Sequence, residues 1–403
     1  MTQIPLSELQ TLAVGLVAAV LGTALTHRLR VLKRLDIPSP VVGGIFVAVV
    51  VTLIRAWAGV EFTFGTQLSE FFLLMFFTTV GLSAKLSSLK SGGKPLALLC
   101  GITVLLIVAQ NVVGVLIALM FGAHPYHGLL VGSVSLVGGP GTAAAWGKEA
   151  QAIGLEHAPE VAMAGATLAV VAGALVAGPA TGWLVRRKGL TGPSGPSAAP
   201  WVDPGASADE KSAAGPSIEQ VMRTLLLLIG IILLGESLNM RARAAGFMLP
   251  GFLTAMLCGV LVTNFADVFR MKLAMGPVER NGQIALQAFL AMYLMSLRLW
   301  TLGGIIVPLA LNIIVQIVLI LLIGYRLLFR ALGRDYDAAL AVGGFVGFGL
   351  SSMAVGMATM DSVARRYGPS ARAFLLITLA GSFFVDLANA FVVQAFLLLP
   401  IFR

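Results

Sequence analysis

Long apolar windows alternate with short polar segments along almost the whole chain. A helix that crosses a membrane needs about 20 consecutive, mostly apolar residues. Windows of this kind lie near residues 7–26, 38–57, 67–84, 96–121, 159–185, 221–240, 247–265, 283–302, 306–328 and 372–399. The pattern predicts an all-α polytopic membrane protein with about 10 transmembrane helices.

Two further apolar windows, at 128–147 and 338–360, differ from the others because glycine crowds them. Glycine and proline interrupt helical hydrogen bonding, and non-helical backbone is tolerated at membrane depth only where it is buried in protein or lines a water-filled cavity. We therefore expect each window to be a re-entrant segment, which enters the membrane and returns on the same side.

The distribution of basic residues supports re-entry, because cytoplasmic loops collect Lys and Arg. If the chain starts outside and both Gly-rich windows turn back, 21 basic residues lie inside and 6 outside. If both windows cross, the division is 14 to 13. The first arrangement places both termini in the periplasm. It also explains the net charge of +9 as cytoplasmic anchoring, without nucleic-acid binding.

The composition and the polar residues of the chain argue against a soluble protein, an intramembrane enzyme and a channel. The chain is 58% apolar and 11% charged, whereas soluble chains are roughly 45–50% apolar and about 25% charged. An intramembrane enzyme would need a nucleophile and a base at helical spacing, but Asp386 stands alone and no His lies in a predicted span. A channel would need continuous polar rows, and few are visible. These observations predict a transporter without enzymatic activity.

The two halves of the chain resemble each other at a constant offset. Segment 83–89 recurs as 296–302, and the tetrapeptide 95–98 recurs as 308–311, both 213 residues later. Each half holds five spans, an odd number, so the second copy must be inverted relative to the first. We predict an N-terminal repeat at 1–188, a flexible cytoplasmic linker at 189–217 and a C-terminal inverted repeat at 218–403. Inverted repeats are typical of secondary transporters, whose substrate site lies near the midplane.

The two glycine-rich windows are the candidate substrate site. Backbone N–H groups left free at a helix break, with a helix starting near Thr142, form an anion site because the helix dipole points at the ligand. Since the two windows enter from opposite faces, their tips can meet at the midplane. The candidate substrate-binding residues are Ser135, Gly138, Gly139, Gly141, Thr142, Gly347, Gly349, Ser351 and Ser352.

Asp386 is the candidate for cation coupling. It lies near the middle of the last predicted span, with Asn389 three residues further on the same helix face. An acidic residue at that depth is costly in lipid and is a functional-site hypothesis by default. It can ligate sodium, carry a proton or meet the ammonium group of a substrate, and the pattern leaves all three open.

Six short motifs together resemble the bacterial glutamate:sodium symporter family, over nearly the whole chain. They are 40–44, 80–85, 138–142, 160–167, 366–370 and 383–390. The resemblance implies an inner-membrane homodimer of two inverted five-helix repeats that carries L-glutamate with sodium by elevator-like alternating access. It also adds Thr167 to the cation-coupling group. The chain departs from the family motif at one position. The resemblance implies Gly-Gly-His-Gly-Thr at residues 138–142, but this chain has Pro140 where the motif has His.

Two alternatives within transport stay open at this point. A 2-hydroxycarboxylate symporter of the citrate or malate type has a similar architecture, and a dicarboxylate carrier can be driven by protons instead of sodium. Neither the exact substrate nor the coupling ion follows from the motifs. We predict sodium-coupled symport of L-glutamate or a close dicarboxylic amino acid.

Overall fold

The computed structural model describes residues 2–29, 39–87, 92–192, 218–244, 249–271, 273, 275–299 and 306–402. Within the described residues, each predicted apolar window falls largely on helix. The long helices are α1 (Glu8–Arg28), α3 (Ser39–Ala58), α4 (Gln67–Leu82), α6 (Gly93–Met120), α9 (Ala158–Arg187), α11 (Ile218–Ala244), α12 (Gly251–Val268), α13 (Met275–Met295) and α14 (Ile306–Ile323). Among the described residues, seven helices are long and apolar enough to cross a membrane. The chain is therefore a multi-pass membrane protein.

Two details differ from the predicted windows. Helix α13 occupies Met275–Met295 rather than 283–302, because the polar residues Glu279 and Arg280 in its first turns were excluded from the apolar window. The last window, 372–399, is not one continuous helix: α18 (Ala371–Leu379), the π-helix η4 (Ala380–Phe384) and α19 (Val385–Leu397) follow one another. The predicted linker 189–217 lies outside the described residues beyond Gly192.

A short parallel sheet was not expected in an all-α chain. Strand β1 (Thr2–Pro5) pairs with β2 (Val60–Thr63) in the register Thr2 to Val60. Directly after β1, the Glu8 carboxylate accepts hydrogen bonds from the backbone N–H groups of Gln67 and Leu68, both at 3.1 Å. An acidic group at the N-terminus of α4 is favourable for the helix dipole. The start of the chain is thereby fixed to the end of α3 and the start of α4.

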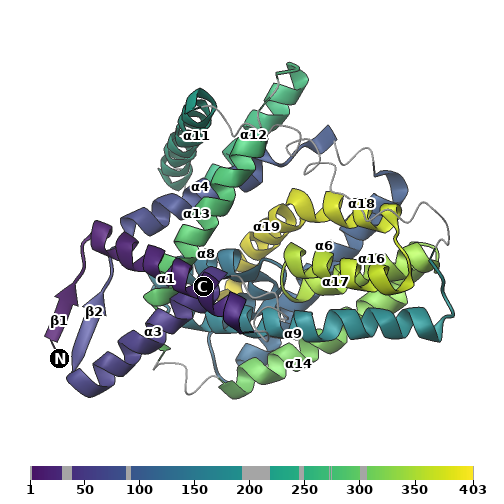
Figure 1. The fold of residues 1–403 in the computed structure, drawn as a ribbon, viewed down its shortest axis with the longest axis horizontal. Coiled ribbons are helices and arrows are strands. Elements are labelled where there is room, and N and C mark those ends of the chain that lie inside the picture. The colour runs from purple at the N-terminus through teal and green to yellow at the C-terminus, as the bar shows by residue number, and fades with distance from the viewer. Residues whose placement is uncertain are drawn as a thin grey trace.

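The helices form two groups that lie on different sides of Figure 1. In the first group, α1 packs on α3 and α13, and α4 packs on α12 and α13, with α11 against α12. The second group contains α6, α9, α14, α18, α19 and two broken hairpins. Each group thus combines helices from both halves of the chain. The backbones of α1 and α3 approach so closely that a Cβ atom at Gly43 would overlap the carbonyl oxygen of Ala18.

The two glycine-rich windows fold as helical hairpins with a break at the tip. The first runs through α7 (Pro125–Leu129), the π-helix η1 (Leu130–Val134) and α8 (Gly139–Ala152). The second consists of α16 (Tyr336–Leu350) and α17 (Met353–Tyr367), separated by two residues. The remaining described elements, η3 (Gly324–Leu328), α15 (Phe329–Ala331) and η5 (Pro400–Phe402), extend helix ends.

Helix caps explain where α16 of the second hairpin and helix α18 begin. The Asp335 side chain accepts a hydrogen bond from the N–H of Ala338 at 2.7 Å, and Ser370 accepts one from Ala373 at 3.1 Å. Such side chains satisfy N–H groups that the first helical turn leaves free. At the two hairpin tips, by contrast, neither Gly138 nor Ser352 makes a side-chain cap. Among the described residues, no side chain accepts a hydrogen bond from the first-turn N–H groups of α8 or α17.

Candidate functional site

The tips of the two hairpins meet. Gly139 has a φ of +66°, in the left-handed region that favours glycine, and a Cβ atom there would lie 2.9 Å from the carbonyl oxygen of Ser351. In the second hairpin the break falls at Ser351 and Ser352, where Ser352 has extended backbone. The helix breaks of the two halves of the chain therefore adjoin each other inside the second group of helices.

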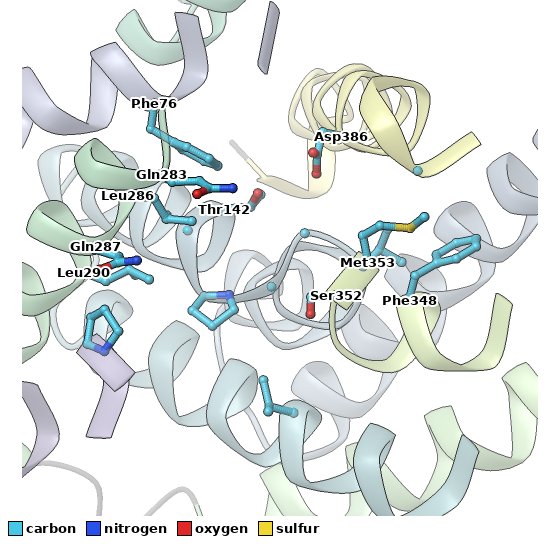
Figure 2. Close-up of a pocket in the computed structure, with 18 of the residues that line it drawn as sticks. Phe76, Thr142, Gln283, Leu286, Gln287, Leu290, Phe348, Ser352, Met353 and Asp386 are labelled. Carbon is cyan, nitrogen blue, oxygen red and sulfur yellow. The ribbon is translucent and has the colours of Figure 1, made fainter. Parts of the chain in front are cut away.

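A cavity of about 500 Å³ lies between this meeting point and the first group of helices. Its walls come from both groups, and Figure 2 shows Asp386 on one side with Phe76 and Gln283 across from it. The volume is within the range of roughly 300–1,000 Å³ found for small-molecule sites. Of the predicted site residues, Gly138, Gly139, Gly141, Thr142, Ser352 and Asp386 line it.

The first turn of α8 contributes backbone donors to this cavity. The helix begins at Gly139, three residues earlier than Thr142, where the sequence predicted its start. Pro140 lies in the first turn, where its fixed φ suits a helix and its missing N–H breaks no helical hydrogen bond. It supplies no donor, so the first-turn N–H groups of Gly139 and Gly141 remain to face an anion. Helix α17 presents its own N-terminus from Met353 on the other side of the break.

Asp386 is the one ionisable residue among those that line the cavity. It lies in the first turn of α19, directly after the π-helix η4. π-Helical turns often occur at functional sites because they shift the register of a helix locally. Within the described part of the chain, its carboxylate forms no hydrogen bond or ion pair. An unpaired carboxylate in a mostly apolar cavity attracts a cation.

Several predicted residues lie close to the tips but outside the cavity lining. The Ser135 hydroxyl lies within hydrogen-bond distance of the Leu130 carbonyl oxygen in its own hairpin and of the Ala162 carbonyl oxygen of α9, and it donates its proton to one of them. Gly347 faces Gly356 across the second hairpin, and Gly349 faces Ile320 and Leu106. Ser351 is fully buried against Gly173 of α9. Thr167 donates to the Met163 carbonyl within α9 at 2.8 Å. These residues shape the tips and their supports, as the glycines allow close packing.

Asn389 faces the first hairpin and not the cavity. The Ser133 hydroxyl lies 2.6 Å from Asn389 Oδ1 and 2.8 Å from Asn111 Oδ1, and it donates its proton to one of them. The Asn389 amide donates to the Ser133 carbonyl oxygen at 3.2 Å. All three side chains are fully buried. Asn389 therefore satisfies polar groups at the first helix break, although it is only three residues from Asp386.

Sequence reasoning missed the wall of the cavity that the first group of helices provides. Its polar members are Thr23, Ser39, Gln283 and Gln287, and Phe76 and Leu286 form the apolar part. Phe76 and Leu286 lie opposite Gly141 of the hairpin tip. Two glutamines one helical turn apart on α13 were the available signal, but they sit at the edge of an apolar window and resemble interhelical hydrogen-bonding residues.

A polytopic membrane protein with two broken hairpins that meet beside a partly buried carboxylate, between two groups of helices, has the features of a secondary transporter. The sequence pattern of the sodium/glutamate symporter family matches residues 4–369. The sodium/glutamate symporter of Haemophilus influenzae is 37% identical over 389 residues, which cover 95% of both chains. That of Escherichia coli is 35% identical over 401 residues, 98% of this chain and 99% of the relative. The chain belongs to the sodium/glutamate symporter family.

Proposed function

We propose that this protein carries L-glutamate across the membrane together with sodium. The observation that carries the proposal, beside family membership, is the single cavity in which two helix N-termini and one unpaired carboxylate face the same space. Glutamate has two carboxylates and one ammonium group. The backbone N–H groups at the tips suit the carboxylates, because free amides and helix dipoles attract anions. Asp386 suits the ammonium group or a sodium ion.

The proposal includes the membrane arrangement inferred from the sequence. Two inverted repeats, 1–188 and 218–403, are supported by the recurrence of a helix end: α13 ends 213 residues after α4. Re-entry of both hairpins is supported by their breaks and by the distribution of basic residues. The periplasmic termini, the cytoplasmic linker, the inner-membrane location and the homodimer stay predictions.

The proposal also includes alternating access, which is supported by the position of the cavity relative to the end at which the two helix groups are in contact. The cavity reaches Ser39 and Pro40 at the start of α3. At the other end of α3, two contacts join the helix groups. Lys148 of α8 forms an ion pair with Glu70 of α4 at 2.6 Å. Glu160 of α9 accepts a hydrogen bond from the backbone N–H of Arg298 at 3.1 Å. In the predicted orientation the sealed end is periplasmic, so we infer a cytoplasm-facing state.

The experiment that tests the function is uptake of labelled glutamate into proteoliposomes, with sodium and proton gradients imposed separately. We expect concentrative uptake with a sodium gradient alone. Unlabelled citrate and malate, added in excess, are expected to leave that uptake unchanged. Uptake driven by protons alone, or inhibition by citrate or malate and not by glutamate, would contradict the proposal.

The Lys148–Glu70 ion pair gives a prediction about the state of the transporter. Replacing Lys148 with Gln is expected to shift the population toward the outward-facing state about twofold to fivefold, since a partly exposed pair contributes roughly 0.2–1 kcal/mol. The measurement is labelling of a single Cys at Gln283 by an impermeant thiol reagent in right-side-out vesicles, after Cys100 and Cys258 have been replaced.

A charge-swapped pair and a remote pair are the controls for this experiment. The double variant Lys148→Glu with Glu70→Lys is expected to restore the original labelling. Arg365→Gln breaks an ion pair of 2.8 Å within α17, between Arg365 and Asp361, and is expected to leave labelling unchanged. Equal labelling of the Lys148→Gln variant and the parent protein would show that the Lys148–Glu70 pair does not hold the two helix groups together at the end of α3.

A further inference from the structure

A second cavity, separate from the transport cavity, lies between α9 and α17. It has a volume of about 540 Å³, and these two helices pack side by side in Figure 1. Ala174, Gly178 and Pro179 form its apolar wall on α9, and Val355 and Ala358 form the wall on α17. The lack of side chains at Gly178 and Gly182 opens the groove. No residue of the transport cavity lines it.

Two guanidinium groups stand at one end of this groove. Arg186, from the last turn of α9, donates a hydrogen bond to the Tyr367 hydroxyl at 3.0 Å, and Arg366 lies over the Tyr367 ring at 5.5 Å. Within the described residues, neither guanidinium has a carboxylate at ion-pair distance. Their neighbours behave differently: Arg365 pairs with Asp361, and Arg187 stacks on Trp183. The groove therefore has two cations that are held in place but not neutralised.

Thr359 also lines the groove, and within the part of the chain that the structure describes its hydroxyl forms no hydrogen bond. The two guanidinium groups are donors of the kind that bind a phosphate, because charge-assisted hydrogen bonds from arginine to phosphate are strong.

We propose that this groove binds one anionic phospholipid. The groove lies at the basic end of α9, a helix apolar enough to span the membrane, so its arginines are at the depth of lipid headgroups. The apolar walls fit an acyl chain. The residues that line the groove include no Asp or Glu, so the ammonium group of a zwitterionic headgroup would find no counter-ion. Basic pockets between membrane helices bind anionic headgroups in this way.

Lipid bound there would support the second hairpin. Helix α17 is one arm of that hairpin, and Gly173 of α9 packs against Ser351 at its tip. The groove occupies the space between the same two helices further along. A lipid in the groove would therefore fix the distance between α17 and α9, on which the position of the tip depends.

The test is binding of phosphatidylglycerol to the detergent-purified full chain, counted by native mass spectrometry, with phosphatidylcholine as the zwitterionic reference. We expect one phosphatidylglycerol retained per chain and no retained phosphatidylcholine. The double variant Arg186→Gln with Arg366→Gln is expected to bind about tenfold more weakly. The matched control, Arg187→Gln with Arg365→Gln, removes the same charge from the same two helices and is expected to bind normally.

A second variant tests the groove without touching a charge. A Cβ atom at Gly178 would have no atom within 4 Å, so Gly178→Leu places its side chain in the groove. Leu is a better helix former than Gly, so the variant is expected to fold at least as well while losing the lipid. Gly230 of α11 also faces open space, and Gly230→Leu is the control. Normal lipid binding by Gly178→Leu, equal loss in both arginine pairs, or stabilisation by inorganic phosphate alone would overturn the proposal.

Discussion

Replacing Asp386 with Asn is expected to reduce concentrative glutamate uptake by roughly tenfold to a hundredfold, because a contact with a charged group contributes about 1.5–3 kcal/mol. The carboxylate lines the cavity between the two helix groups and has no hydrogen bond or ion pair within the described chain. Asn has nearly the same shape, so packing is preserved and only the charge is lost. The measurement is initial uptake in proteoliposomes, with protein amount and thermal stability checked for each variant.

The control for this substitution is Asp361→Asn. Asp361 is an exposed residue of α17 that pairs with Arg365, so uptake is expected to stay within a factor of two. Sodium dependence separates the two roles of Asp386. If Asp386→Asn retains glutamate exchange but loses its response to sodium, the carboxylate ligates sodium; if glutamate binding is lost at every sodium concentration, it meets the ammonium group. Normal sodium-driven uptake would remove Asp386 from the site.

Replacing Gly139 with Ala is expected to reduce uptake at least tenfold. The residue has a φ of +66°, which disfavours a side chain by about 1–2 kcal/mol. In addition, the new Cβ atom would lie 2.9 Å from the Ser351 carbonyl oxygen, so the two tips must move apart. The expected change is therefore in substrate affinity as well as in stability, measured as the glutamate concentration at half-maximal uptake.

Gly59 provides a matched control for the cost of placing a side chain at a residue with positive φ. It has a φ of +65°, but no atom lies within 4 Å of the position of its Cβ. Gly59→Ala is thus expected to lower thermal stability to a similar degree while glutamate affinity stays unchanged. If both variants transport equally well, the meeting of the tips does not matter for binding. If both lose affinity equally, the effect comes from stability alone.

The sequence was sufficient for most of the helices and for several residues that line the candidate cavity, for physical reasons. Apolar windows of about 20 residues permit few other structures in a membrane, and glycine clusters mark the breaks that become Gly139 and Ser352. Asp386 stood out because an acidic residue is costly at that depth. Each of these signals is local, in that it depends on residues close together in the chain.

What could not be predicted depends on contacts between distant segments. Gln283 and Gln287 line the cavity only because α13 packs opposite the hairpin tips, a placement that no local pattern encodes. Asn389 shares a helix face with Asp386 by spacing, but Ser133 of another element turned out to be its partner. The strand pair β1–β2 escaped notice because four residues of pairing leave too short a pattern to distinguish from a loop.

The bond between Ser133 and Asn389 has a consequence for how two ligands influence each other. It joins α19, which carries Asp386, to the break of the first hairpin, whose amides face the same cavity. A cation that displaces α19 would displace that break as well, and a substrate that fixes the break would fix α19. Thermodynamic linkage then requires reciprocity: the factor by which the cation raises substrate affinity equals the factor by which the substrate raises cation affinity. Cutting this bond would weaken that coupling, so each ligand would raise the affinity for the other by a smaller factor.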